Sequence, residues 1–173
     1  MHTSSGVVAL AFSGGLDTSY CVPRLAEQGW AVHTVYVNTG GATPDERAAI
    51  RRQAEAVGSV AHHEVDARDL VFDRFVRFLI QGNVLRGGVY PLSVAAERTQ
   101  QAISVLEVAR AIGATAVAHG STGAGNDQVR FEVALRTLAP ELEILAPVRD
   151  RAFKRPEQLE YLEYRKLPVP PFG

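Results

Sequence analysis

The sequence predicts an α/β fold, a doubly wound and mostly parallel sheet with helices on both faces. Two observations predict it. Short apolar runs, such as residues 7–12, are typical of strands buried on both faces of a parallel sheet, and they alternate along the chain with stretches of helical period. Glycine-rich turns follow several of these runs, as expected where a strand passes into a helix. The 173 residues suffice for one domain with a proper core, placed at residues 1–166.

The elements follow from local signals. Apolar or β-branched runs predict strands at residues 7–12, 31–37, 61–65, 116–118 and 142–146. Helical spacing and end signals predict helices at residues 18–28, 44–57, 70–80, 93–112 and 127–138.

Some of these assignments rest on particular residues. Thr43 is expected to cap the second helix, with Pro44 at its first position. Pro23 is expected in the first turn or two of its helix, where proline is tolerated. The Phe72, Phe75 and Phe78 side chains are expected to pack at helical spacing. The proline-rich residues 167–173 are predicted to be a tail or the start of a missing second domain.

The composition excludes several classes of function. With 46% hydrophobic and 21% charged residues the chain resembles an ordinary soluble protein, and its net charge of −1 gives no overall attraction to nucleic acid or to acidic membranes. The single cysteine, Cys21, allows neither an internal disulfide nor a CxxC pair, and it is expected in the core. No metal site is predicted, because the adjacent His62 and His63 point to opposite faces of a strand. We expect a cytoplasmic protein with no nucleic acid or membrane partner.

The segment SGGLDTS, residues 13–19, directly follows the first apolar run. A helix N-terminus attracts phosphate through unpaired N–H groups, and hydroxyls of Ser13, Thr18 and Ser19 add donors. The lysine of a Walker A loop and the spacing of GxGxxG are both absent. The segment resembles the pyrophosphate loop of N-type ATP pyrophosphatases; the alternative is a tight turn in which Asp17 caps the helix.

A second glycine-rich segment, HGSTGAGNDQVRFE at residues 119–132, follows the fourth predicted strand. Ligands of open α/β sheets bind at the carboxyl ends of the strands, so both segments are expected to face one crevice. Its side chains Thr122, Asn126, Asp127 and Arg130 suit a polar zwitterion. The alternative is a connection in which Asn126 or Asp127 only caps the next helix and Arg130 is exposed.

Together the two segments resemble the argininosuccinate synthase family, from about residue 7 to residue 168. The resemblance implies the Rossmann-like fold of the adenine nucleotide alpha hydrolases and an ATP-dependent ligase. Such an enzyme joins citrulline to aspartate through a citrullyl-adenylate and releases AMP and pyrophosphate. The resemblance also implies ATP with Mg²⁺, and a homo-oligomer that is a tetramer in full-length members.

The resemblance carries over residue by residue. Residues placed at ATP are Ala11, Phe12, Ser13, Gly14, Gly15, Leu16, Asp17, Thr18, Ser19, Val37, His119 and Gly120. Residues placed at the amino-acid substrates are Tyr90, Arg98, Thr122, Asn126, Asp127 and Arg130. Asp17, Asn126, Asp127 and Arg130 are expected to serve the reaction directly. Arg98 is not itself carried over from the resemblance: it is available as a carboxylate or phosphate partner, and a surface helix arginine is the alternative.

The sequence departs from the family at two places and in length. Ser93, Val94 and Ala95 replace a Gly-Thr-Ser run that contacts the substrates in many members, and Gly41 replaces a common glutamine. Family chains are more than twice as long, so we expect a domain fragment or a shortened relative that binds ATP but turns over weakly or not at all alone.

Two other functions remain open. Enzymes that thiolate tRNA or form lysidine share the first loop, but the lone cysteine and the net charge of −1 argue against both. A nucleotide-binding sensor, or a subunit completed by another chain, is the non-enzymatic alternative.

Overall fold

A five-stranded parallel sheet runs through the centre of the molecule in a computed structural model that describes residues 6–91, 93–123 and 127–170. The strand order is β3-β2-β1-β6-β7, and every neighbouring pair is parallel. The strands are β1 (Gly6–Ala11), β2 (Trp30–Asn38), β3 (Ala61–Asp66), β6 (Ala116–Ala118) and β7 (Glu143–Leu145). The chain moves outward from β1 to β3 and then crosses to β6, so the order reverses between β1 and β6. Such a switch point is where open α/β sheets bind ligands.

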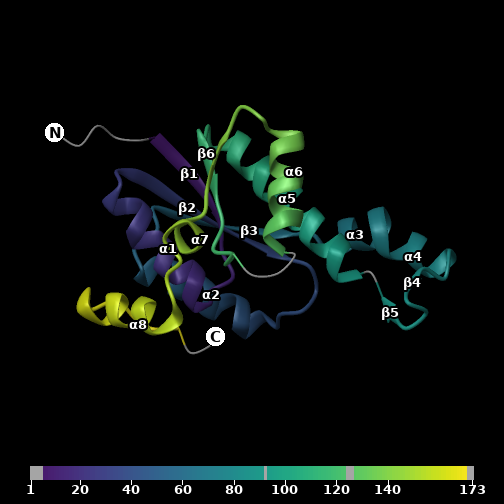
Figure 1. Cartoon of the computed structure of the whole chain (residues 1–173), viewed down its shortest axis with the longest axis horizontal. Helices are drawn as coiled ribbons and strands as arrows, with labels where there is room; N and C mark the ends of the chain where they lie inside the picture. Colours follow the sequence, from purple (N-terminus) through teal and green to yellow (C-terminus); the bar gives the residue numbers. More distant parts are fainter. Residues whose placement is uncertain (1–5, 92, 124–126, 171–173) are drawn as a thin grey trace.

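Helices cover both faces of the sheet, which confirms the predicted fold class (Figure 1). Val8 and Leu10 of β1 belong to one core, and Ala9 between them belongs to the other. The helices on the first face are α1 (Leu16–Glu27), α2 (Pro44–Ala56), α7 (Pro147–Arg151) and α8 (Arg155–Tyr164). The second face carries α5 (Ser93–Ala111) and α6 (Asp127–Leu138).

The predicted N-cap of α2, Thr43, and the first-position proline are confirmed. Thr43 is the N-cap, its hydroxyl accepts a hydrogen bond from the Glu46 N–H (3.3 Å), and the Glu46 carboxylate accepts one from the Thr43 N–H (2.7 Å). This reciprocal pair satisfies two helix-end donors. Both β6 and α6 also have the predicted bounds.

The prediction for Pro23 is wrong. Helix α1 begins at Leu16, earlier than the sequence indicates, so Pro23 lies beyond its first two turns. Its ring is buried, which gives the residue a packing role there. Cys21, in the same helix, is fully buried as predicted, and burial raises the pKa of its thiol.

The segment after β3 forms an arm, residues 68–91, that extends away from the sheet (Figure 1). It consists of α3 (Arg68–Val71), a π-helical turn (Phe72–Val76), α4 (Arg77–Gln81) and the antiparallel pair β4 (Leu85–Arg86) and β5 (Tyr90–Pro91).

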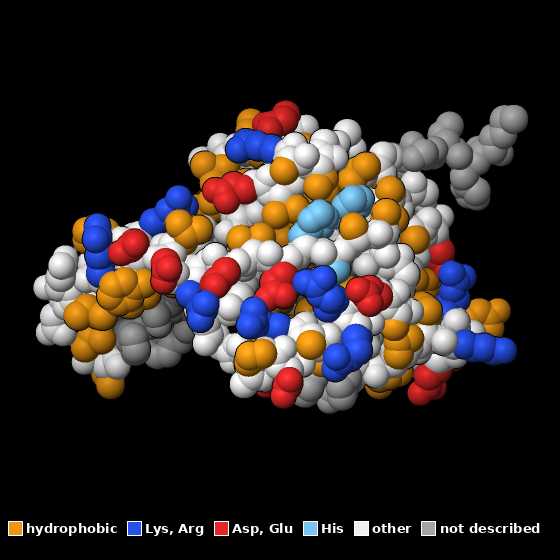
Figure 2. Space-filling model, turned by 180° about the vertical axis from the view of Figure 1, so that it is seen from behind, with side chains coloured by type: hydrophobic (Ala, Val, Ile, Leu, Met, Phe, Trp, Pro, Cys, Tyr) orange, Lys and Arg blue, Asp and Glu red, His pale blue; other side chains and the backbone are white. Residues whose placement is uncertain are grey.

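The expected aromatic packing on this arm is wrong for two of its phenylalanines. Phe72 and Phe78 are 52% and 53% exposed. The π-helical turn breaks the 3.6-residue period on which the prediction rested. Figure 2 shows apolar side chains gathered on the arm, whose exposed members are Phe72, Phe78, Ile80, Val84, Leu85 and Val89.

The C-terminal segment adds two helices that the sequence patterns did not predict, α7 and α8. Ala152 ends α7 in the left-handed conformation (φ 50°). Beyond α8 the chain returns to α2, where the Gln53 side-chain amide donates to the Pro168 carbonyl oxygen (2.9 Å). None of the described helices combines the length and apolar character needed to cross a membrane.

Candidate functional site

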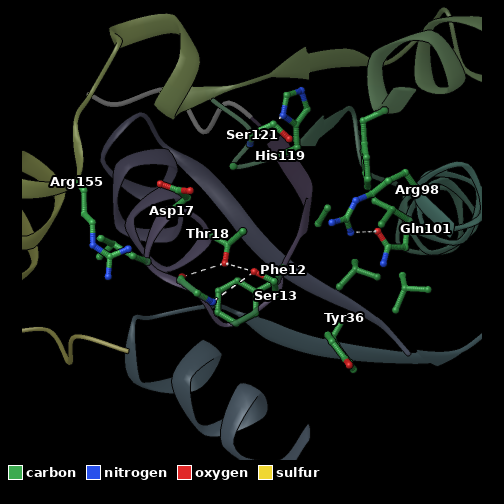
Figure 3. Close-up of a pocket in the computed structure, with 18 residues that line it drawn as sticks. Phe12, Ser13, Asp17, Thr18, Tyr36, Arg98, Gln101, His119, Ser121 and Arg155 are labelled. Carbon is green, nitrogen blue, oxygen red and sulfur yellow. Dashed lines mark hydrogen bonds between the residues drawn. The ribbon is translucent and has the colours of Figure 1, made fainter. Parts of the chain in front are cut away.

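A cavity of about 400 Å³ lies at the carboxyl ends of β1, β2 and β6, where the strand order reverses (Figure 3). The described residues that line it are Ala11, Phe12, Ser13, Gly15, Leu16, Asp17, Thr18, Val35, Tyr36, Val37, Arg98, Gln101, Val105, His119, Gly120, Ser121, Phe131 and Arg155. The two glycine-rich segments therefore do face one cavity.

The first loop joins β1 to α1 with its polar groups organised around the helix start. Gly15 is the N-cap, in an extended conformation and with no side-chain cap, so Asp17 does not take that position. The Thr18 hydroxyl donates to the Gly15 carbonyl oxygen (3.2 Å), and it lies 3.3 Å from the Ser13 hydroxyl. The first N–H groups of a helix lack partners within the helix, so this end of α1 offers donors and a positive dipole end to the cavity.

Two residues predicted at ATP, Gly14 and Ser19, do not line the cavity. Gly14 has φ +78°, and a Cβ there would lie 2.9 Å from Ile50 Cγ1, so the residue lets the turn pass beneath α2. Ser19 is fully buried, and its hydroxyl accepts a hydrogen bond from the Gln53 side-chain amide (3.2 Å). In this structure both residues join the loop to α2.

The second loop touches the first at Gly120. A Cβ on Gly120 would lie 3.0 Å from Thr18 Cγ2 and 3.2 Å from both the Asp17 carbonyl carbon and the Thr18 nitrogen. A residue larger than glycine would therefore push the second loop away from the first turn of α1.

His119 stands beside this contact and is almost completely buried, at 2% exposed. Burial and the nearby Arg149 lower the pKa of its imidazole to about 4, so the ring is neutral at pH 7. Its Nδ1 accepts a hydrogen bond from the Ser121 N–H (3.3 Å), which leaves the proton on Nε2. Nε2 lies 3.7 Å from Glu132, which also pairs with Arg149. The ring therefore orders the backbone of the second loop.

The residues predicted at the amino-acid substrates are only partly placed in the cavity. Arg98 lines it and donates to the Gln101 side-chain oxygen (2.8 Å). Thr122 is exposed and Arg130 half-buried, and neither is among the lining residues. Asp127 is the first residue of α6 and Tyr90 lies in β5, but the structure does not describe their side chains. Asn126 lies outside the described residues.

Several lining residues were missed by the sequence analysis. Tyr36 and Ser121 are next to predicted residues, so their positions at the strand ends could have suggested them. Gln101 and Val105 lie on the same face of α5 as Arg98, at spacings of three and four residues. Arg155 has no local signal, because it belongs to the unpredicted helix α8.

The histidines near the sheet make side-chain contacts with one another and with β2. His62 Nδ1 lies 2.9 Å from the Thr34 hydroxyl, and His63 stacks on His33 with ring nitrogens 3.1 Å apart. Within the described part of the chain, no group of three or more His, Cys, Asp or Glu side chains is arranged to hold a metal ion.

The family model and the curated relatives that match this chain indicate the same family. The family model described as the arginosuccinate synthase N-terminal HUP domain matches residues 7–168. Argininosuccinate synthase of Rubrobacter xylanophilus is 45% identical over 163 residues, covering 94% of this chain and 39% of that protein. The enzymes of Pyrobaculum aerophilum and Methanocaldococcus jannaschii are 44% and 40% identical, with 41% of each covered. The chain thus spans about two fifths of the length of the curated relatives it matches.

Solved structures show the same fold at low identity. A 4-thiouridine synthetase in complex with RNA and bound ATP superposes with a TM-score of 0.69 at 17% identity, over 92% of this chain and 40% of that chain. A predicted subunit of a tRNA methyltransferase from Methanocaldococcus jannaschii gives a TM-score of 0.59 at 16% identity, over 92% and 76% of the two chains.

Proposed function

The chain belongs to the argininosuccinate synthase family, as its N-terminal HUP domain, and from this membership we propose that it binds ATP in the cavity between its two glycine-rich loops. The contact of Gly120 with the first turn of α1 carries this proposal. It brings the helix N-terminus and the second loop to one cavity, where one ligand can touch both.

The orientation of ATP follows from the chemistry of the two ends of the cavity. The start of α1, with the Ser13 and Thr18 hydroxyls, suits the β- and γ-phosphates. Tyr36 and Val37, at the end of β2, form the side where the adenosine is proposed to lie. Gly120 then lies near the middle of the nucleotide, close to the α-phosphate.

The proposed reaction needs positioning and charge neutralisation rather than a covalent nucleophile of the protein. The carbonyl-type oxygen of citrulline attacks the α-phosphorus, a new P–O bond forms, and the bond to the bridging oxygen breaks as pyrophosphate leaves. The ammonium group of aspartate gives up a proton to solvent, and the resulting amine attacks the activated carbon and displaces AMP. This gives argininosuccinate, AMP and pyrophosphate.

The substrate roles remain proposals built on the second loop and the start of α6. The Thr122 hydroxyl is proposed to donate to a carboxylate of aspartate, and Asp127 to pair with its ammonium group. Arg130 is proposed to bind the citrulline carboxylate through its forked donors, together with Asn126 and Tyr90. The exposure of Thr122 supports a site open to solvent, where amino acids can reach a bound nucleotide.

Mg²⁺ fits the donor set of the cavity when ATP supplies most of its ligands. Among the described lining residues, Asp17 is the carboxylate, and Mg²⁺ is commonly held by one or two carboxylates plus substrate phosphates. The ion would neutralise charge on the departing pyrophosphate. Asp17 is therefore proposed to hold Mg²⁺ with the phosphates.

Isothermal titration of ATP, with and without Mg²⁺, tests the nucleotide site. Asp17→Asn should weaken ATP binding in Mg²⁺ by about tenfold or more and change it little in EDTA. Asp45→Asn is the matched control, because Asp45 holds the same second position in α2 but lies outside the cavity lining. Equal affinities of the two variants in Mg²⁺ would remove Asp17 from the site.

A second titration separates the enzyme from the alternatives. We expect citrulline and aspartate, added after ATP, to alter the heat or affinity of nucleotide binding, with weak or no turnover because the matched relatives are more than twice as long. Nucleotide binding that ignores both amino acids would favour a sensor or a subunit completed by another chain. Robust argininosuccinate formation by these 173 residues would refute the expectation of weak turnover.

A further inference from the structure

The first loop carries no cation, although pyrophosphate leaves with several negative charges. Residues 13–19 contain neither lysine nor arginine. Among the described residues that line the cavity, the cationic side chains are Arg98 and Arg155.

Arg98 lies at the other end of the cavity. It belongs to α5 and donates to Gln101, one turn further along the same helix. Figure 3 shows Arg98 and Gln101 together across the cavity from Asp17, with Thr18 between the two sides. This position suits the proposed adenosine side or an amino-acid carboxylate rather than the terminal phosphates.

Arg155 lies at the phosphate end. It is the first residue of α8, and Figure 3 shows it on the same side of the cavity as Asp17, at the start of α1. Arg155 comes from a helix about 140 residues further along the chain than the first loop. A cation supplied from so far away leaves no signal in the sequence of the loop itself. Arg155 is exposed to solvent and also lines the cavity, so a ligand that enters from solvent meets this residue.

The helix that carries Arg155 is held firmly against α1. The Tyr161 ring packs edge-on against Tyr20 (5.1 Å between centroids), and its hydroxyl donates to the Glu27 carboxylate (2.8 Å). Arg165, just past the end of α8, pairs with the same carboxylate (3.1 Å). With Leu162 fully buried as well, α8 lies along α1, and the position of Arg155 is set by the packing of the two helices.

We propose that Arg155 binds the β- and γ-phosphates of ATP and stays with the pyrophosphate as it leaves. The proposal rests on ATP occupying the cavity in the orientation given above. A guanidinium presents paired N–H donors that match two phosphate oxygens at once, and it stays charged at every physiological pH. Arg155 thus supplies the positive charge that the first loop lacks, and it selects nucleotides with a free pyrophosphate end.

Titration of ATP, inorganic pyrophosphate and AMP against three variants tests this assignment. Arg155→Gln should weaken ATP and pyrophosphate binding about 10- to 100-fold and leave AMP within about twofold. Arg155→Lys keeps the charge without the fork and should fall between wild type and Arg155→Gln. Arg52→Gln is the matched control, because it removes the same charge from an exposed side chain of α2 that lies outside the cavity lining and makes no part of the packing of α8.

The outcomes separate this proposal from the one on which it rests. Equal ATP affinities of Arg155→Gln and Arg52→Gln would overturn the role of Arg155 while leaving ATP binding intact. An equal loss for AMP and ATP would also overturn it, because the phosphate-end assignment requires AMP to be spared. Wild-type protein that binds no ATP would overturn the proposed function itself, and the role of Arg155 with it.

Discussion

The contact between the two loops can be tested by a single methyl group at Gly120. In Gly120→Ala the new Cβ would lie 3.2 Å from two backbone atoms, the Asp17 carbonyl carbon and the Thr18 nitrogen. Backbone at the start of a helix cannot turn aside as the end of a flexible side chain can. The second loop must therefore retreat from α1 by a few tenths of an ångström.

The size of the effect follows from the cost of overpacking. Forcing an extra methyl group into a well-packed site typically costs about 1–3 kcal/mol. If ATP has to draw both loops back to their original separation, the same free energy is lost from binding, and the Kd rises roughly 5- to 150-fold. Unfolding should shift as well, by about 2–4 °C in Tm per kcal/mol for a domain of this length.

Calorimetric titration with ATP, together with thermal unfolding followed by circular dichroism, measures both quantities. Gly41→Ala is the control, since a Cβ at Gly41 meets no atom within 4 Å and the residue lies outside the cavity lining. Wild-type affinity in a folded Gly120→Ala protein would refute the reasoning, because the contact of the loops would then have no bearing on the nucleotide.

Three further predictions concern the body of the domain. Ala152→Gly should raise Tm by up to a few degrees, because the roughly 1–2 kcal/mol of strain of a non-glycine residue at φ 50° outweighs the about 0.4–1 kcal/mol of unfolded-chain entropy that glycine adds, and differential scanning calorimetry measures the change. Stability should fall as the pH drops from 6.5 to about 4, because the unfolded His119 takes up a proton that the folded one resists. Urea titrations should show that the free energy of unfolding falls by up to about 3 kcal/mol over this pH range in the wild type and by less in His119→Gln. An equal pH dependence in the two proteins would exclude His119 as the group responsible. The Cys21 thiol should resist Ellman's reagent at pH 8 in the folded protein and react once guanidinium unfolds it; fast labelling of the native protein would contradict its burial.

The sheet could be predicted because its strands are buried on both faces. Such strands read as continuous apolar runs, and β6 with Ala116–Ala118 is bounded as predicted even though it is short. Helix α2 was equally predictable, since its cap, its proline and its first-turn acids are all local signals.

The arm and the last helix could not be predicted from the same kind of pattern. Phe72 and Phe78 match a helical period, yet a π-helical turn interrupts that period and both side chains are half exposed. Helix α8 buries little besides Gln158 and Leu162, so its apolar pattern is faint, and it is stabilised by contacts with α1 that are distant in sequence.

The residues of the candidate site also fall into two groups, those that local sequence predicts and those that depend on tertiary packing. Residues in the strand-to-helix loops, such as Ser13, Asp17 and Gly120, follow directly from glycine-rich sequence after a buried strand. Gly14 and Ser19 belong to the same segment but face α2, and only the packing of Ile50 and Gln53 reveals this. Residues contributed by helices, such as Gln101, become visible only once the topology is known.

The sheet and the helices contribute different parts of the proposed nucleotide site. The reversal of strand order between β1 and β6 sends the two following connections to opposite faces, so a cavity opens where the loops diverge and closes at Gly120, where they still touch. That geometry supplies backbone donors, but the first loop brings no cationic side chain. The proposed positive charge at the phosphate end comes from Arg155, and its place depends on Tyr161 packing against the buried Tyr20 of α1. Any change that loosens α8 should therefore weaken ATP more than AMP, although it leaves every residue of the first loop untouched.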